Sequence, residues 1–280
     1  MHHNGSLWIA ERQTQEIRVF DSGSGAHLFT IGGRGDGPGE FRQSRFLGFD
    51  AEGAAYVYDD RQRRLSLFSE SGEFQGSHLM PASLGISPRP LHVTQTGTLL
   101  GSIPRALEHI PANGLTVRDT VRTWIMPLDG TAPTLVAETL GPLWYFHDGR
   151  QIVVPFTEGS LRGFWDDRAY VTDGAGEMSY SVYSPAGLDR KVEIERATRK
   201  IDDFSATMFV EQLRRARVPE SLVRFYETHL PDMPIPESQR AWDAMVVTDQ
   251  GGAWLRRAGD ANETVAGVSP VDRVWDVFDA

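Results

Sequence analysis

The sequence predicts an all-β fold made of repeated units of four short strands, and two observations support this. The first is a phrase in which a turn glycine is followed by two strands rich in aromatic and aliphatic residues. It spans residues 5–21 and returns at residues 53–69. The second is that looser copies begin at Gly97, Arg168 and Gly252. A repeat of about 40–50 residues with four strands in each copy is typical of a β-propeller blade.

The composition is that of a folded globular protein. Hydrophobic residues make up 40% of the 280 residues and charged residues 24%, which favours a sizeable core over disorder. The net charge is −10 without a long basic run, so no nucleic-acid partner is expected, because such a surface must neutralise phosphates. The absence of cysteine excludes disulfides and thiolate metal sites. No apolar run approaches the roughly 18 residues that span a bilayer, so no membrane span is expected.

In the first two units, strands are indicated by alternating apolar and polar residues between turn residues. The turn Asp-Ser-Gly-Ser-Gly that begins at Asp21 separates two of them, because these residue types tolerate tight-turn backbone angles. The expected strands are 6–10, 16–21, 27–31, 46–49, 54–58, 64–69 and 73–79.

The third unit is irregular, since a long loop at residues 103–118 interrupts it. The strands expected in the last three units are 91–94, 98–102, 120–127, 134–138, 151–156, 168–172, 179–184, 191–196, 244–248, 253–257 and 273–279. The first unit then lacks an opening strand and the last a closing strand. A propeller normally closes by pairing strands from both termini, and an unclosed array leaves strand edges exposed. Either a sixth unit is shared between the two ends or the chain is a truncated stretch of a longer protein, and we expect truncation.

A helical hairpin is expected near residues 203–230, within a Pro-rich insertion at residues 197–242. Apolar residues recur at helical spacing in 204–216, and Pro219 suits the first turn of a second helix. The second helix presents an apolar stripe of Leu222, Tyr226 and Leu230. The hairpin either covers an exposed patch of the propeller or forms a lid or docking surface.

The glycine-dense stretch carries a family resemblance. Ile17-Arg-Val-Phe-Asp, followed by Ile31-Gly-Gly-Arg-Gly-Asp-Gly-Pro-Gly-Glu-Phe41, resembles a phrase of bacterial six-bladed β-propeller proteins, relatives of the NHL-repeat propellers. Pro234-Ile-Pro before a late Gly-Gly-Ala-Trp254 strand is similar to the same family. At the level of motifs the match covers residues 5–80 and 231–257.

This resemblance implies a single six-bladed β-propeller domain over residues 1–280, of which five units are recognisable. It also implies export to the periplasm or cell surface, although residues 1–4 do not resemble a signal peptide.

The long links between units are the predicted binding region. In this topology they lie on one face: residues 32–45, 80–90, 103–118, 197–243 and 258–272. Long loops on one face of a rigid scaffold commonly carry binding. We therefore expect a non-enzymatic protein that binds a protein, peptide or glycan on its loop-bearing face.

Arg34, Asp36 and Glu40 are candidate ligand-binding residues in the glycine-rich link. The glycines would let backbone amides approach an anionic ligand, with assistance from Arg34. Alternatively, the glycines and Pro38 simply form a tight corner between two blades, with Phe41 as a plug.

Asp59 and Arg61 end a strand at the same face, and His109 lies on the long loop of the third unit. Adjacent carboxylates Asp59 and Asp60 could hold Ca²⁺, or they could form a solvated turn with a local ion pair. The alternative function is a Ca²⁺-dependent lactonase-like or esterase-like hydrolase, in which Glu40, Asp59 and Asn113 would converge.

No catalytic residue, bound metal or cofactor is otherwise assigned. The sequence has no His-Glu-x-x-His and no Gly-x-Ser-x-Gly motif. Among the seven tryptophans, Trp144, Trp165 and Trp242 lie near loops and could stack on a sugar or an aromatic ligand.

Overall fold

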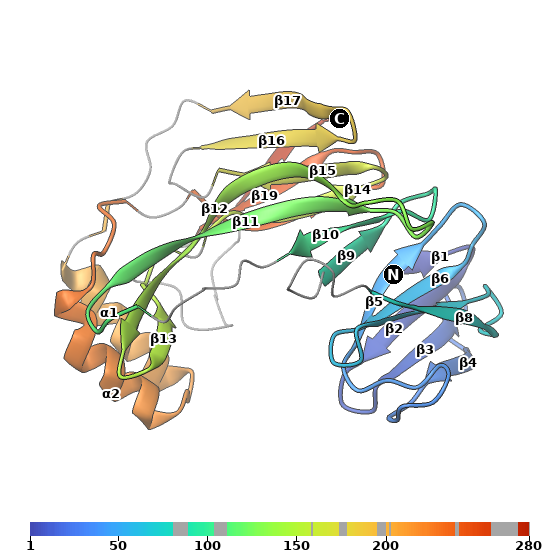
Figure 1. The fold of residues 1–280 in the computed structure, drawn as a ribbon, viewed down its shortest axis with the longest axis horizontal. Coiled ribbons are helices and arrows are strands. Elements are labelled where there is room, and N and C mark those ends of the chain that lie inside the picture. The colour runs from blue at the N-terminus through green and yellow to red at the C-terminus, as the bar shows by residue number, and fades with distance from the viewer. Residues whose placement is uncertain are drawn as a thin grey trace. The chain divides into compact units, whose positions relative to one another are not determined.

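The structure is a computed structural model of the chain. It describes residues 1–80, 89–103, 111–157, 159–173, 178–194, 200–201, 203–238, 241–258 and 274–279. In this part of the chain, twenty strands, two α-helices and one 3₁₀ helix form (Figure 1). The predicted all-β class is therefore confirmed. The strands belong to five antiparallel sheets, and the chain divides into two compact units.

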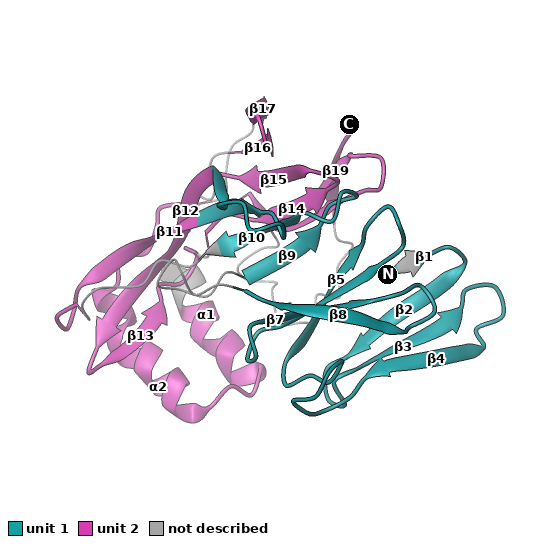
Figure 2. Ribbon diagram, turned by 45° about the vertical axis from the view of Figure 1, so that its right-hand side comes forward, with its two compact units in different colours: residues 1–106, 122–136 teal, residues 107–121, 137–280 magenta. Residues whose placement is uncertain are grey.

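The first unit comprises residues 1–106 and 122–136 (Figure 2, teal). Its first sheet contains β1 (His2–His3), β2 (Ser6–Glu11), β3 (Glu16–Asp21) and β4 (His27–Gly32). Its second sheet contains β5 (Ser44–Phe49), β6 (Ala55–Asp59), β7 (Arg64–Phe68) and β8 (Phe74–Leu79). The short β1 pairs with β2 and supplies an opening strand, which corrects the expectation that the first sheet lacks one.

The third sheet differs most from its prediction. It contains β9 (Arg89–Val93), β10 (Leu99–Ile103), β11 (Thr116–Met126), β12 (Thr134–His147) and β13 (Arg150–Val153). The segment expected to open the fourth sheet is instead β13, which pairs with β12. The reason is a two-residue turn at Asp148 and Gly149, whose φ values are 47° and 69°. Positive φ at both turn residues matches the twist of a tight hairpin.

The second unit comprises residues 107–121 and 137–280. Its four-stranded sheet contains β14 (Arg162–Trp165), β15 (Arg168–Thr172), β16 (Ser179–Ser184) and β17 (Gly187–Glu193). The last sheet contains β18 (Trp242–Val247), β19 (Ala253–Arg257) and β20 (Trp275–Phe278). The strands β11 and β12 are divided between the units: residues 122–126 and 134–136 belong to the first, and residues 116–121 and 137–147 belong to the second.

Within each unit, successive sheets share apolar cores. Side chains alternate between the two faces of a strand. On β6, Ala55 and Val57 join the core of Trp8, whereas Tyr56 and Tyr58 join the core of Val93 on the third sheet. Both faces of the second sheet are thus buried.

In the second unit, Tyr170 and Tyr180 pack in the same way with Trp242 and Leu255 of the last sheet. This repeated face-to-face packing of small antiparallel sheets is a propeller-like fold.

The predicted helical hairpin is confirmed as α1 (Asp203–Arg215) and α2 (Glu220–His229), followed by η1 (Leu230–Asp232). The helices lie beside β13 in Figure 1. Their apolar side chains share a core with residues of the β12–β13 hairpin. Val223, Phe225 and Tyr226 of α2 share a core with Tyr145 of β12 and the nearby Val154. Among the described residues, no helix has the length and apolar character needed to cross a bilayer.

Candidate functional site

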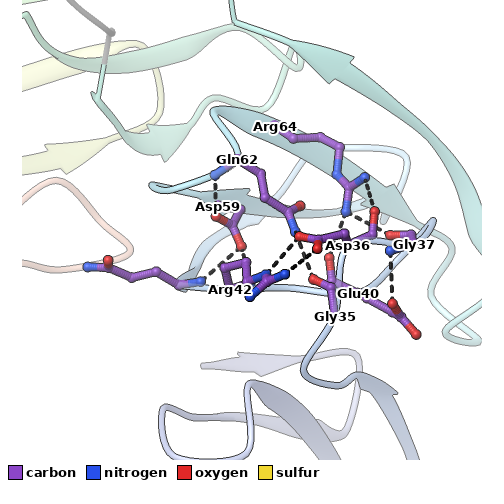
Figure 3. Close-up of polar contacts among 9 residues, drawn as sticks. Gly35, Asp36, Gly37, Glu40, Arg42, Asp59, Gln62 and Arg64 are labelled. Carbon is purple, nitrogen blue, oxygen red and sulfur yellow. Dashed lines mark hydrogen bonds and ion pairs between the residues drawn. The ribbon is translucent and has the colours of Figure 1, made fainter.

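The glycine-rich link, residues 32–45, forms a folded corner, which we call the glycine corner (Figure 3). Phe41 is fully buried in the core of the first two sheets. The N–H of Phe41 donates to the carbonyl of Gly33 at 2.8 Å, and the N–H of Gly35 donates to the carbonyl of Phe41 at 3.1 Å. The backbone of the corner therefore folds back on itself, and Phe41 plugs it.

Asp36 and Glu40 are held by other groups of the glycine corner. Asp36 forms an ion pair with Arg42 and accepts a hydrogen bond from Nε2 of Gln62 at 3.1 Å. The hydrogen bond from Arg42 is the main reason that the pKa of Asp36 lies below its ordinary value. Glu40 accepts the N–H of Gly37 through Oε2 at 2.8 Å. Glu40 therefore occupies one of the backbone amides that were expected to bind an anionic ligand.

Arg64 of β7 fastens the corner to the second sheet. Its guanidinium donates to the carbonyls of Asp36, Gly37 and Glu40 at 3.2, 2.7 and 2.7 Å. Three carbonyls of one loop are thereby held by one rigid, planar donor group. Arg64 was not among the candidate residues chosen from the sequence. It can hold the corner because it begins β7, from where its side chain reaches the loop.

Asp59 is fully buried at the end of β6. Its Oδ2 accepts the N–H groups of Arg42 and Gln43 at 2.5 and 2.9 Å. Its Oδ1 accepts the N–H groups of Arg61 and Gln62 at 2.8 and 2.7 Å. A carboxylate offers about four lone-pair positions, so all of them are used within the protein. The structure thus brings Asp36, Glu40 and Asp59 to one corner, where Asp59 is a structural acceptor.

The remaining predicted residues contribute less to this corner. Arg34 is exposed and donates to the carbonyl of Gln13 at 3.0 Å. The Arg61 side chain is also exposed and has no hydrogen bond or ion pair to any described residue. His109 lies outside the described residues. Asn113 belongs to the second unit, where its amide and the backbone and side chain of Asp148 exchange two hydrogen bonds of 2.9 Å.

These contacts do not fit the expected calcium site. Ca²⁺ requires about six to eight oxygen ligands. The oxygens of Asp59 are already occupied by four amides, and Asn113 is paired with Asp148. Across the described part of the chain, no group of three or more His, Asp or Glu side chains could hold a metal ion.

The tryptophans are mainly structural. Trp242 is only 3% exposed and lies in the core, which corrects the expectation that it could stack on a ligand. Trp165 is half-buried, and its indole N–H donates to the carbonyl of Asp249 at 2.9 Å. Trp144 is half-buried on β12, opposite Val153 of β13.

A hollow that the sequence did not reveal lies at the helical hairpin. It measures about 730 Å³ and is bordered by α1, the end of α2, η1 and residues 233–237. We call it the helical groove. Its lining includes the apolar Val210, Met233 and Ile235 and the carboxylates Glu211, Glu227 and Glu237. The sequence feature that could have indicated this groove is the pair of apolar residues Met233 and Ile235, which alternate with three prolines.

The five sheets and their packing define a propeller-like all-β protein. No protein-family model matches the sequence, and no curated protein matches it. A Bacteroides fragilis protein described as exported aligns over 100% of this chain and 67% of its own, with 11% identity and a TM-score of 0.54. A member of the DUF4221 family from Bacteroides vulgatus aligns over 99% and 75%, with 10% identity and a TM-score of 0.51. These neighbours are propeller-like, and at such identities the likeness concerns the fold alone.

Proposed function

We propose that the chain is a non-enzymatic binding protein and that the helical groove binds a short basic peptide segment of a partner protein. The proposal includes a single six-bladed, NHL-like propeller domain over residues 1–280, with residues 197–242 as its insertion. The observation that carries the binding role is the groove itself, because it combines an apolar floor with an acidic rim on one of the long links.

The floor of the groove suits one or two apolar side chains of a peptide. Val210 and Met233 are less than a tenth exposed, and Ile235 is half-buried. Burying one aliphatic or aromatic side chain contributes about 1.5–3 kcal/mol. A volume of about 730 Å³ is within the range of binding pockets and exceeds the needs of one side chain.

The rim of the groove favours a basic peptide. Three carboxylates line it, against a single guanidinium, that of Arg214. Arg214 is ion-paired with both Glu211 and Glu227, so these three groups together carry one negative charge, and Glu237 adds a second. The net charge of the whole chain is also negative, at −10. A Lys or Arg beside the apolar anchor of the peptide would gain attraction and a faster encounter.

The base of the groove is packed on a sheet, which limits the ordering that binding would require. The other side of α2 packs against Tyr145 and Ile152 of the β12–β13 hairpin. Tyr226 adds a hydrogen bond from its hydroxyl to the carbonyl of Val153 at 2.8 Å. A preformed groove does not have to be ordered when the peptide arrives.

No described group supports the hydrolase alternative or a nucleic-acid partner. The carboxylates that a metal would need are engaged at the glycine corner, and the acidic groove would repel phosphates. The proposed partner class is therefore a protein, engaged through a peptide segment.

The test uses a library of fluorescein-labelled ten-residue peptides that pair Leu or Phe anchors with Lys, Arg, Asp or Glu. Fluorescence anisotropy should select basic members over their acidic counterparts. Glu237→Lys and Ile235→Asp should each weaken the selected peptide about tenfold or more, which corresponds to about 1.4 kcal/mol.

The matched control is Glu220→Lys, which reverses a charge on α2 at a residue that does not line the groove. It should leave the affinity within about twofold. Equal binding by Glu237→Lys, Ile235→Asp and the unchanged protein, or selection of acidic peptides, would refute the proposal.

A further inference from the structure

A second hollow in the second unit has a different chemistry. It measures about 450 Å³ and lies between residues of β11 and β12 and the face of the β14–β17 sheet. We call it the hydroxyl cleft. Its hydroxyl-bearing lining residues are Thr120, Thr139, Thr172, Ser179, Ser181 and Tyr183. Its apolar lining residues are Leu140, Val171 and Leu188.

Strand register explains why this space is open. Val171 of β15 pairs with Ser181 of β16, which pairs with Lys191 of β17, so the three side chains share one face. Tyr183 occupies the same face two residues further along β16. The other face carries Tyr170 and Tyr180 and is filled by the last sheet. The small Ser179 and Ser181 of β16 leave the hollow on the first face, whereas Tyr170 and Tyr180 fill the second.

Ser179 is the clearest indication of a ligand. It is only 3% exposed and lines the cleft, and its hydroxyl has no hydrogen bond to any described residue. This hydroxyl is therefore free to bond to a ligand that enters the cleft. Ser181 and Tyr183 also line the cleft without a side-chain hydrogen bond to the described residues.

Other hydroxyls are held in place. Oγ1 of Thr172 accepts the N–H of Leu161 at 2.8 Å. Oγ1 of Thr139 accepts the hydroxyl of Ser160 at 2.8 Å. Fixed groups of this kind keep the cleft in one shape before a ligand arrives.

We propose that the hydroxyl cleft binds a saccharide of one or two rings. Hydroxyls donate and accept, as the hydroxyls of a sugar do, so neither side needs a fixed charge. The charged lining residues are Glu138, Asp173 and Lys191, and Lys191 is ion-paired with Glu193 at 2.6 Å, so the cleft has no excess of positive charge for an anion. Leu140, Val171 and Leu188 offer apolar surface to the C–H face of a ring. The volume is within the range of small-molecule sites.

The test is a panel of neutral mono- and disaccharides of glucose, galactose, mannose and N-acetylglucosamine. Saturation-transfer NMR on the full chain should identify at least one binder, and calorimetry should give its affinity. Ser181→Leu fills the cleft and should weaken that affinity at least tenfold. Tyr183→Phe removes one hydroxyl and little volume, so it should weaken the affinity severalfold while the melting temperature changes little.

The matched control is Ser77→Leu, the same change at an exposed strand position of the second sheet. It should leave saccharide affinity unchanged, as should Glu237→Lys in the helical groove. If no saccharide in the panel binds, the proposal is wrong. The proposal is equally wrong if both Ser181→Leu and Tyr183→Phe bind the saccharide as well as the unchanged protein does. Tyr183→Phe keeps the test valid if Ser181→Leu impairs folding.

Discussion

The hydroxyl of Tyr226 donates a hydrogen bond of 2.8 Å to the carbonyl of Val153, which joins α2 to the β12–β13 hairpin. The same ring is buried among Phe209 of α1 and Phe225 of α2. One side chain thus links the base of the helical groove to a sheet. The relationship explains why an insertion of two short helices has a defined position on the second unit.

Tyr226→Phe should lower the free energy of unfolding by about 1 kcal/mol, because one hydrogen bond is lost and its acceptor stays near the core. Tyr226→Ala should cost more, about 3–5 kcal/mol, since a cavity is added. Urea denaturation followed by circular dichroism measures both. Equal stability of Tyr226→Phe and the unchanged protein would show that the hydrogen bond contributes nothing.

Asp59→Ala should destabilise the first unit strongly. The change leaves four backbone N–H groups without their acceptor, and each unsatisfied buried donor costs about 1–3 kcal/mol. We expect a loss of at least about 3 kcal/mol in thermal or urea unfolding. Asp36→Ala is the control, because Asp36 is exposed, and its melting temperature should stay close to that of the unchanged protein. Similar effects of the two changes would contradict the structural role of Asp59.

The protein should lose stability at high pH. Burial raises the pKa of Tyr58 to about 12, and burial with a hydrogen bond to Asp50 raises the pKa of Tyr56. Because the folded state holds the tyrosine proton more tightly than the unfolded chain, this group contributes fully to the stability of the fold below the ordinary pKa near 10. That contribution is lost as the pH rises through about 12. For Tyr58 this amounts to about 2–3 kcal/mol.

Absorbance of tyrosinate at about 295 nm, together with circular dichroism, follows this transition between about pH 10 and 12. In Tyr58→Phe, stability should fall less steeply over that interval. Tyrosine residues that all titrate near pH 10 while the fold stays intact would contradict the expected shift.

Gly32→Ala should be more damaging than Gly25→Ala. Both glycines have positive φ, 87° and 73°, so any side chain adds backbone strain. Only at Gly32 would the new Cβ also lie 2.8 Å from the Phe41 ring and 2.9 Å from the carbonyl of Gln15. We expect Gly25→Ala to lower the free energy of unfolding by about 1–2 kcal/mol and Gly32→Ala to lower it clearly more. Thermal unfolding of the two variants measures the difference, and equal losses would show that crowding against Phe41 is unimportant.

The strand pattern of the protein could be predicted from the sequence because it depends on near neighbours. Turn glycines such as Gly5, Gly53 and Gly97 have positive φ in the structure, and the strands follow them. The helical hairpin was also predictable, since its apolar residues recur at helical spacing. The pairing of Arg150–Val153 with β12 was missed although Asp148-Gly149 is a hairpin signal, because residues 151–156 were assigned to the following unit.

The candidate sites depend on contacts between distant residues, so the sequence could not place them. In the sequence, Asp59 resembles a metal ligand. In the structure, backbone N–H groups of the loop at Arg42 donate two hydrogen bonds to its carboxylate. The hydroxyl cleft arises from the cross-strand register of Val171, Ser181 and Lys191, which local periodicity does not specify.

By itself, the sequence determined the all-β class, the turns and the helical hairpin, because backbone preferences and hydrophobic periodicity act within a few residues. Only the tertiary structure decided which polar groups are satisfied and which face a hollow. Hydrogen bonding and burial of a side chain depend on atoms that the chain brings together from far apart in the sequence.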